Sequence, residues 1–154
     1  MLVAFAALFG ACSGTPTAAP IASLLSTEGV PGVSVSLSAA PRRIAPGDSI
    51  EFVATALNST NQSIQIGVQC GPSFDIVLTG PQGYAATVLA LITGPNGAFT
   101  CELSPRHFAP ANGSQTMRFR IAAPRRLGRY TAVAGLRRAD GLSNLSASAT
   151  FEIR

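Results

Sequence analysis

Apolar and polar residues alternate along most of the chain after residue 32, which is the pattern of strands that bury one face. In VSVSLSA, residues 33–39, Val33, Val35 and Leu37 share one face and the serines share the other. The same period of two returns in later stretches, whose inward positions are expected at Ile50, Phe52 and Ala54; at Met117, Phe119 and Ile121; at Tyr130, Ala132, Ala134 and Leu136; and at Ala147, Ala149, Phe151 and Ile153.

Turn residues separate these stretches. Pro46-Gly47-Asp48, Gly71-Pro72 and the GPQG of residues 80–83 read as turns, and SIQIGVQC (63–70) and SFDIVLT (73–79) read as further strands. Residues 84–92 are ambiguous between strand and helix. The pattern predicts an all-β fold over residues 33–154, an antiparallel Ig-like β-sandwich of about 7–9 strands.

Asn-x-Ser/Thr sequences occur at Asn58, Asn61, Asn112 and Asn144, and all are expected in turns, which Asn and Ser favour.

The chain opens with an apolar run that ends at a cysteine. Residues 1–11 carry no charged side chain, and Gly10 and Ala11 lead directly to Cys12. A run of this length is too short for a bilayer-spanning helix, which needs about 20 residues, but it suits a secretory signal. The order of apolar run, small residues and cysteine resembles the lipobox of bacterial lipoproteins, in which the cysteine carries a diacylglyceryl group.

We therefore expect residues 1–11 to be a signal peptide and Cys12 to be lipidated; a plain signal peptide and a buried N-terminal strand are the alternatives. Residues 12–32 contain SGTPTAAP and STEGVPG, without a sustained period, and are expected to be a flexible linker with no packing before residue 33. The linker would have a reach of about 25 Å. The domain would then lie in the cell envelope, anchored by lipid to a bacterial membrane and facing the periplasm or the exterior.

Two cysteines remain once Cys12 is assigned to lipid. Because the protein is expected to be exported and an even number of cysteines is left, we expect a disulfide between Cys70 and Cys101. Such a disulfide would stabilise the fold by about 3–4 kcal/mol. Two buried free thiols are the alternative.

Composition narrows the classes of partner. The chain has 154 residues, 47% of them hydrophobic, enough for one core of ordinary size. Its net charge is +4, and all eleven basic residues are arginines. They are scattered without interleaved aromatic residues, which argues against nucleic-acid binding.

Arg125, Arg126 and Arg129 flank one predicted turn, and Arg137 with Arg138 precedes another. A basic rim at one or both ends of the sandwich would attract anionic lipid or polysaccharide. Solvated turn arginines without a partner are the alternative interpretation.

Catalytic motifs are poorly supported. Residues 47–50, GDSI, are similar to the nucleophile block of GDSL-type hydrolases, but the chain's single histidine, His107, has no acid three residues before it. Ser49 is better explained as the start of a strand after a turn. One histidine and two paired cysteines cannot supply a metal site, so we expect no metal, no cofactor and no enzymatic activity.

Residues 44–138 resemble the BsuPI family of intracellular proteinase inhibitors, and more loosely the Ig-like modules of bacterial envelope proteins. The motifs that carry the resemblance are Asn58 at the end of a strand, Phe74-Asp75 before an apolar triplet, the turn from Gly80 to Gly83, and Gly128-x-Tyr130. The favoured function is a non-catalytic binding or scaffolding module that meets an envelope protein. The alternative is a BsuPI-type inhibitor whose surface loop occupies a protease. In both, the contact loop is expected between Gly94 and Ser114, at Asn96, Phe99, Arg106 and His107.

Overall fold

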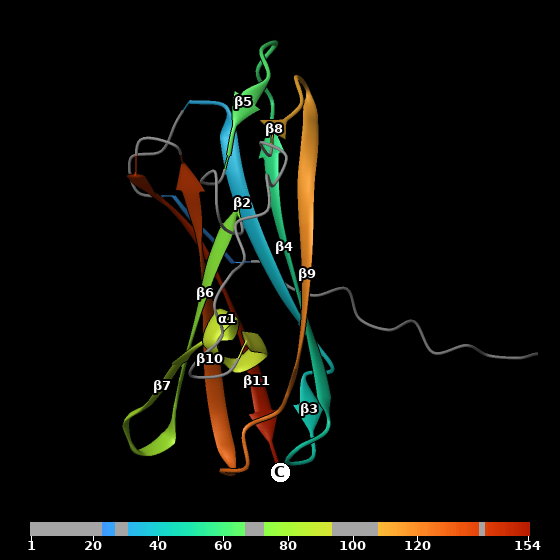
Figure 1. The fold of residues 1–154 in the computed structure, drawn as a ribbon, viewed down its shortest axis with the longest axis vertical. Helices are drawn as coiled ribbons and strands as arrows, with labels where there is room; N and C mark the ends of the chain where they lie inside the picture. Colours follow the sequence, from blue (N-terminus) through green and yellow to red (C-terminus); the bar gives the residue numbers. More distant parts are fainter. Residues whose placement is uncertain (1–22, 27–30, 67–72, 94–107, 139–140) are drawn as a thin grey trace, which may run out of the picture.

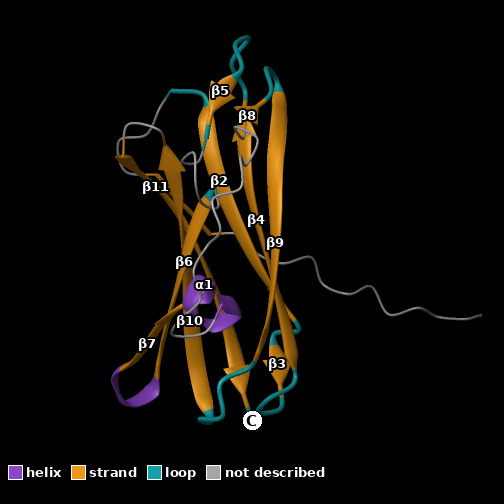
Figure 2. Ribbon diagram, viewed as in Figure 1, coloured by secondary structure: helices purple, strands orange, loops and turns teal. Residues whose placement is uncertain are grey.

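Nine strands form two sheets that face each other in the part of the chain that the computed structural model describes, residues 23–26, 31–66, 73–93, 108–138 and 141–154 (Figures 1 and 2). The larger sheet has the order β1-β11-β10-β6-β7, with β3 beside β11, and the smaller sheet has the order β2-β4-β9. The bounds of the larger sheet's strands are β1 Ser23–Ser26, β3 Arg43–Ile44, β6 Phe74–Gly80, β7 Tyr84–Thr87, β10 Gly128–Arg138 and β11 Gly141–Ile153. Those of the smaller sheet are β2 Val33–Ala40, β4 Ser49–Asn58 and β9 Gly113–Ala122.

Three shorter features complete the described fold. The strands β5 (Ile64–Gln65) and β8 (Phe108–Ala109) form a separate antiparallel pair. The 3₁₀ turn η1 spans Pro81–Gly83, and the single helix of the described residues, α1, spans Val88–Thr93.

The alternating pattern correctly identified the buried faces. Every expected inward position lies in the core between the sheets, where Met117 and Ala149 are partly buried and the others are fully buried. The outward partners Thr116, Arg118 and Arg120 on β9 are exposed. The predicted β-sandwich is confirmed, with one departure from antiparallel pairing, because β3 runs parallel to β11.

Three segments differ from expectation. Ser23–Ser26 form β1 and pair with residues 145–148 of β11, although no packing was expected before residue 33. The stretch SLLS is too short to show a period, and it adds to an edge of β11 that no other described strand occupies at that level. The ambiguous residues 84–92 divide into β7 and most of α1. In the stretch 63–70, only Ile64–Gln65 are a described strand.

Asn144 lies within β11, so the expected turn there is wrong. Asn112 lies in a turn with a positive φ of 50°, and Asn61 lies in a bend, as predicted. Asn58 is the last residue of β4.

Four aromatic rings link the two sheets through the core. Phe52 of the smaller sheet meets Phe151 of β11 edge to face, with ring centroids 5.8 Å apart. Phe151 stacks on Tyr130 at 5.3 Å, and Tyr130 meets Tyr84 edge to face at 5.4 Å. Such pairs add to the free energy gained from burial, by about 0.5–1.5 kcal/mol each.

The side chain of Asn58 organises the end of the sandwich where β4 finishes. It is fully buried, and its amide nitrogen donates to the carbonyl oxygen of Gln62 at 2.8 Å. The same nitrogen lies 3.1 and 3.0 Å from the carbonyl oxygens of Ala109 and Pro110. Its Oδ1 atom accepts from the backbone N–H and the hydroxyl of Thr60, at 3.0 and 2.7 Å. One side chain thereby joins the turn after β4 to the strand β8.

Candidate functional site

Three segments far apart in the sequence meet at the opposite end of the sandwich, close to the C-terminal residue (Figure 1). The backbone N–H of Gly47 donates to the carbonyl oxygen of Ala123 at 3.1 Å, and the N–H of Ala123 donates to the backbone carbonyl oxygen of Asp48 at 2.7 Å. The N–H groups of Glu152 and Arg154 donate to the carbonyl oxygens of Arg42 and Ile44, at 2.8 and 3.1 Å. We call residues 41–48, 123–129 and 152–154 the basic end.

The basic end carries the excess positive charge of the chain. It contains six exposed arginines and two acids, Asp48 and Glu152; the arginines are Arg42, Arg43, Arg125, Arg126, Arg129 and Arg154. The chain's other five arginines are equal in number to its other five acids. The formal net charge of +4 is therefore that of the basic end.

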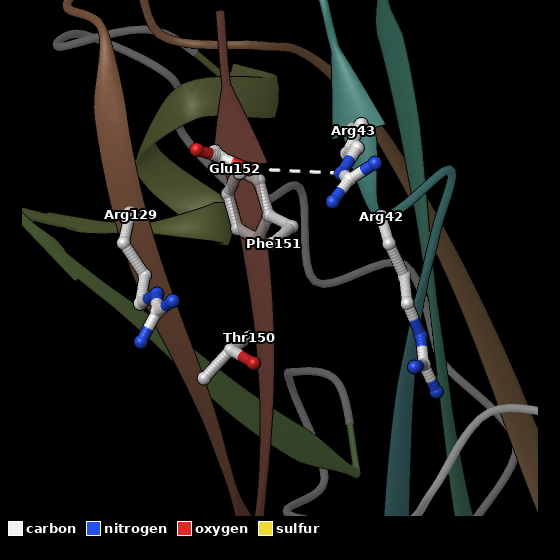
Figure 3. Close-up of a pocket in the computed structure, with 6 residues that line it drawn as sticks. All are labelled: Arg42, Arg43, Arg129, Thr150, Phe151 and Glu152. Carbon is white, nitrogen blue, oxygen red and sulfur yellow. Dashed lines mark ion pairs between the residues drawn. The ribbon is translucent and has the colours of Figure 1, made fainter.

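A hollow of about 290 Å³ lies on the outer face of the larger sheet at this end (Figure 3). It is lined by Arg42, Arg43, Arg129, Thr150, Phe151 and Glu152. Arg129 and Arg43 are the register partners of Glu152 on its two sides, which gives a row of cation, anion and cation across three strands. Arg43 pairs with Glu152 at 3.7 Å, with 67% and 47% of their side chains exposed, so water screens the pair. Guanidinium groups in this arrangement can bind a phosphate or carboxylate.

Leu127 is the most exposed of the large hydrophobic side chains that the structure describes, at 62%. It lies in the segment between β9 and β10, with Arg125 and Arg126 before it and Arg129 shortly after. An apolar side chain therefore projects from the basic end among guanidinium groups.

Tyr130 holds this segment in place. Its hydroxyl donates to the carbonyl oxygen of Arg126 at 2.9 Å, as in the tyrosine corner of Ig-like sandwiches. Gly128 has a φ of +131°, and a Cβ there would lie 2.5 Å from Cγ of Pro81. Burial raises the pKa of the Tyr130 phenol above its ordinary value of 10.0; the nearby Tyr84 adds to this effect, and Arg126 opposes it. The phenol thus remains protonated and able to donate at neutral pH.

Replacement of Tyr130 by phenylalanine is expected to lower the free energy of unfolding by about 1 kcal/mol, because the stacked ring remains and only the hydrogen bond is lost. The raised pKa adds a pH dependence. The protonated phenol contributes its full stabilisation below about pH 10, the unfolded pKa, and loses it as the pH rises through the folded pKa. Urea unfolding at about pH 8 and about pH 11 should show a steeper decline for the wild type than for Tyr130→Phe. Equal declines would contradict this role.

The arginines of the predicted rim lie at two different ends of the sandwich, and only one of the two groups contributes to the basic end. Arg125, Arg126 and Arg129 belong to the basic end, whereas Arg137 lies near the far end of β10 and pairs with Asp75 at 2.6 Å. Arg42, Arg43 and Arg154 were not anticipated as members of the rim. No local sequence signal joins them to residues 125–129, because strand pairing brings them together.

The other predicted site residues lie outside the described residues: Cys12, Cys70, Cys101, Asn96, Phe99, Arg106 and His107. Their lipidation, disulfide and contact roles stay predictions. Ser49 is exposed and begins β4 directly after the turn at Gly47, as the interpretation of GDSI as a turn predicted.

Within the part of the chain that the structure describes, no three His, Cys, Asp or Glu side chains gather as metal ligands would. None of the helices among these residues has the length and apolar character needed to cross a bilayer.

Comparisons with known proteins show the fold. No family model and no curated protein matches the sequence. Among solved structures, the Pseudomonas fluorescens alkylpurine DNA glycosylase AlkC, bound to DNA containing an abasic site analog, is similar with a TM-score of 0.52 and 16% identity. The match covers 80% of this chain and 30% of the glycosylase chain.

The C-terminal domain of Wzt also has a TM-score of 0.52, at 12% identity, with 88% of this chain and 79% of that domain covered. The sporulation control protein Spo0M from Bacillus subtilis has a TM-score of 0.48 at 12% identity, with coverages of 81% and 50%. The two likenesses with a TM-score of 0.52, to the glycosylase and to the Wzt domain, establish a shared β-rich fold and no shared activity.

Proposed function

We propose that the protein is a non-catalytic lipoprotein of the bacterial cell envelope whose β-sandwich serves as a binding or scaffolding module. The observation that carries this proposal is the cysteine at position 12, directly after an apolar run and two small residues. A diacylglyceryl group there would hold the domain at a membrane, since each buried CH₂ contributes about 0.8 kcal/mol.

The architecture of the described residues supports a binding role. Twenty-six hydrophobic side chains form one buried core, which gives a rigid frame. Loops on such a frame commonly carry recognition, whereas acid–base catalysis needs positioned titratable groups within hydrogen-bond reach. The ion pairs among the described residues, including Arg118 and Arg120 with Glu51, lie on strand faces or at the basic end.

Membrane fractionation followed by intact mass measurement tests the proposal. The native protein should be found with membranes, should lack residues 1–11, and should carry added mass from acyl chains on Cys12. The variant Cys12→Ser should retain the unprocessed N-terminus and carry no lipid. Recovery of the wild type from the soluble cytosolic fraction, uncleaved and with three free thiols, would refute the proposal.

The second candidate is a BsuPI-type proteinase inhibitor. It is favoured by the motifs that carry the resemblance, because the Gly80–Gly83 turn and Gly128-x-Tyr130 pack directly on each other. In this function the loop with Asn96, Phe99, Arg106 and His107 would enter a protease cleft. Stoichiometric loss of activity across a panel of bacterial proteases would favour inhibition, and full activity across the panel would favour the binding module.

A further inference from the structure

We propose that the basic end binds the surface of an anionic phospholipid bilayer, with its arginines on the lipid phosphates and Leu127 inserted among the headgroups. Arg42, Arg43, Arg125, Arg126, Arg129 and Arg154 supply the charge. The proposal adds an orientation to the membrane attachment proposed above.

The distribution of charge supports an anionic surface. Six guanidinium groups stand against two carboxylates at one end, while charges elsewhere in the chain balance. Arg42 and Arg129 have no ion-pair partner among the described residues, and the pair of Arg43 with Glu152 is open to solvent. Each exposed arginine near an anionic membrane strengthens the binding of the protein about fivefold. A guanidinium group can also donate two parallel hydrogen bonds to the oxygens of one phosphate.

The exposure of Leu127 favours a lipid bilayer, and not a water-soluble anion, as the ligand of the basic end. The Leu127 side chain is 62% exposed, and it would remove little apolar surface from water at a DNA backbone. At a membrane, its apolar surface leaves water while the neighbouring guanidinium groups remain at the phosphates. Because the hydrogen bond from Tyr130 to Arg126 holds this segment, little conformational entropy is lost when it docks.

The direction of β1 is consistent with the same orientation, and this step rests on the proposed lipid on Cys12. Ser23 lies level with Ser148, and β1 runs from there toward Leu145, away from the basic end. Ser148 lies about 16 Å along β11 from Ile153, at about 3.3 Å per residue. The eleven residues from Cys12 to Ser23 can span up to about 36 Å, enough to place a lipid at the plane of the basic end.

Vesicle sedimentation of the full chain tests the proposal. All chains carry Cys12→Ser, so that acylation is absent and residues 1–11 contribute equally to each. The probes are vesicles of phosphatidylglycerol with phosphatidylcholine, and vesicles of phosphatidylcholine alone. The parent chain should prefer the anionic vesicles, and the preference should fall as salt rises.

Three variants identify the surface. Arg125→Gln/Arg126→Gln should weaken anionic-vesicle binding about 25-fold. The matched control Arg118→Gln/Arg120→Gln removes the same charge from the outer face of the smaller sheet and should change binding less than about twofold. Leu127→Ser should weaken vesicle binding about tenfold and leave binding to a duplex DNA unchanged. Unchanged far-UV circular dichroism confirms that each variant is folded.

Equal losses in the two arginine pairs, or no preference for anionic vesicles, would overturn the proposal. So would DNA binding as tight as vesicle binding together with no effect of Leu127→Ser, which would assign the basic end to nucleic acid. The two proposals fail separately. If the native protein is acylated but its Cys12→Ser chain does not bind anionic vesicles, the lipoprotein proposal stands and the docking proposal is refuted. If the chain is never acylated but binds these vesicles, the docking proposal stands and the lipoprotein proposal is refuted.

Discussion

Replacement of Asn58 by aspartate will lower the free energy of unfolding by about 4 kcal/mol at neutral pH. The substitution keeps the shape of the side chain and the oxygen that accepts from Thr60. It removes the amide donor and turns a buried carboxylate toward the carbonyl oxygens of Gln62, Ala109 and Pro110. Urea unfolding of both proteins measures the difference.

The loss should be smaller at about pH 4, because a protonated aspartate regains one donor. The matched control is Asn61→Asp, three residues along in the same turn, where the side chain is exposed. It should change stability by less than about 0.5 kcal/mol. Similar losses for the two variants would mean that the negative charge, and not the lost donor, causes the effect.

Replacement of Gly80 by alanine will lower the free energy of unfolding by about 2–3 kcal/mol. A Cβ at this position would lie 2.5 Å from Cδ1 of Tyr130 and would also overlap its Cε1 atom. Gly80 has an extended backbone with a φ of −159°, which any residue adopts, so the cost is steric. Tyr130 cannot move away freely, because Phe151, Tyr84 and the carbonyl oxygen of Arg126 hold it.

Gly135→Ala is the control for this prediction. Gly135 lies on β10, the same strand as Tyr130, and a Cβ there would meet no atom within 4 Å. Its replacement should leave stability unchanged or raise it by up to about 1 kcal/mol, because alanine restricts the unfolded chain. Thermal or urea unfolding of both variants decides the comparison. A Gly80→Ala protein as stable as Gly135→Ala would show that the turn repacks at no cost.

Docking through the basic end has a consequence for the proposed binding module. The strand β4 begins at Ser49, beside the basic end, and finishes at Asn58. With the arginines on a membrane, the turns around Asn58, Thr60 and Asn112 would face away from the lipid. A partner in the envelope would then meet that end of the sandwich.

The alternating pattern predicted most of the fold, because the two faces of a strand differ locally and a period of two is visible within a few residues. It correctly placed β2, β4, β9, β10 and β11 with their buried faces. Short segments gave too few residues for any period, so β1 was not predicted and the run that contains most of α1 stayed ambiguous between strand and helix. The prediction of a turn at Asn144 was wrong, because it relied on the turn preference of Asn and Ser, whereas the residue lies within the strand β11.

The chain's sequence by itself determined the β class and the inward residues, since each depends on neighbours within about ten residues. The tertiary structure alone decided which other arginines join Arg125, Arg126 and Arg129, the part of the basic end that the sequence had indicated. Arg42 and Arg43 join Arg125, Arg126 and Arg129 because β3 and β10 pair with opposite sides of β11. Asn58 finds the acceptors Ala109 and Pro110 more than fifty residues away for the same reason. Contacts between distant segments depend on strand order and register, which no local pattern encodes.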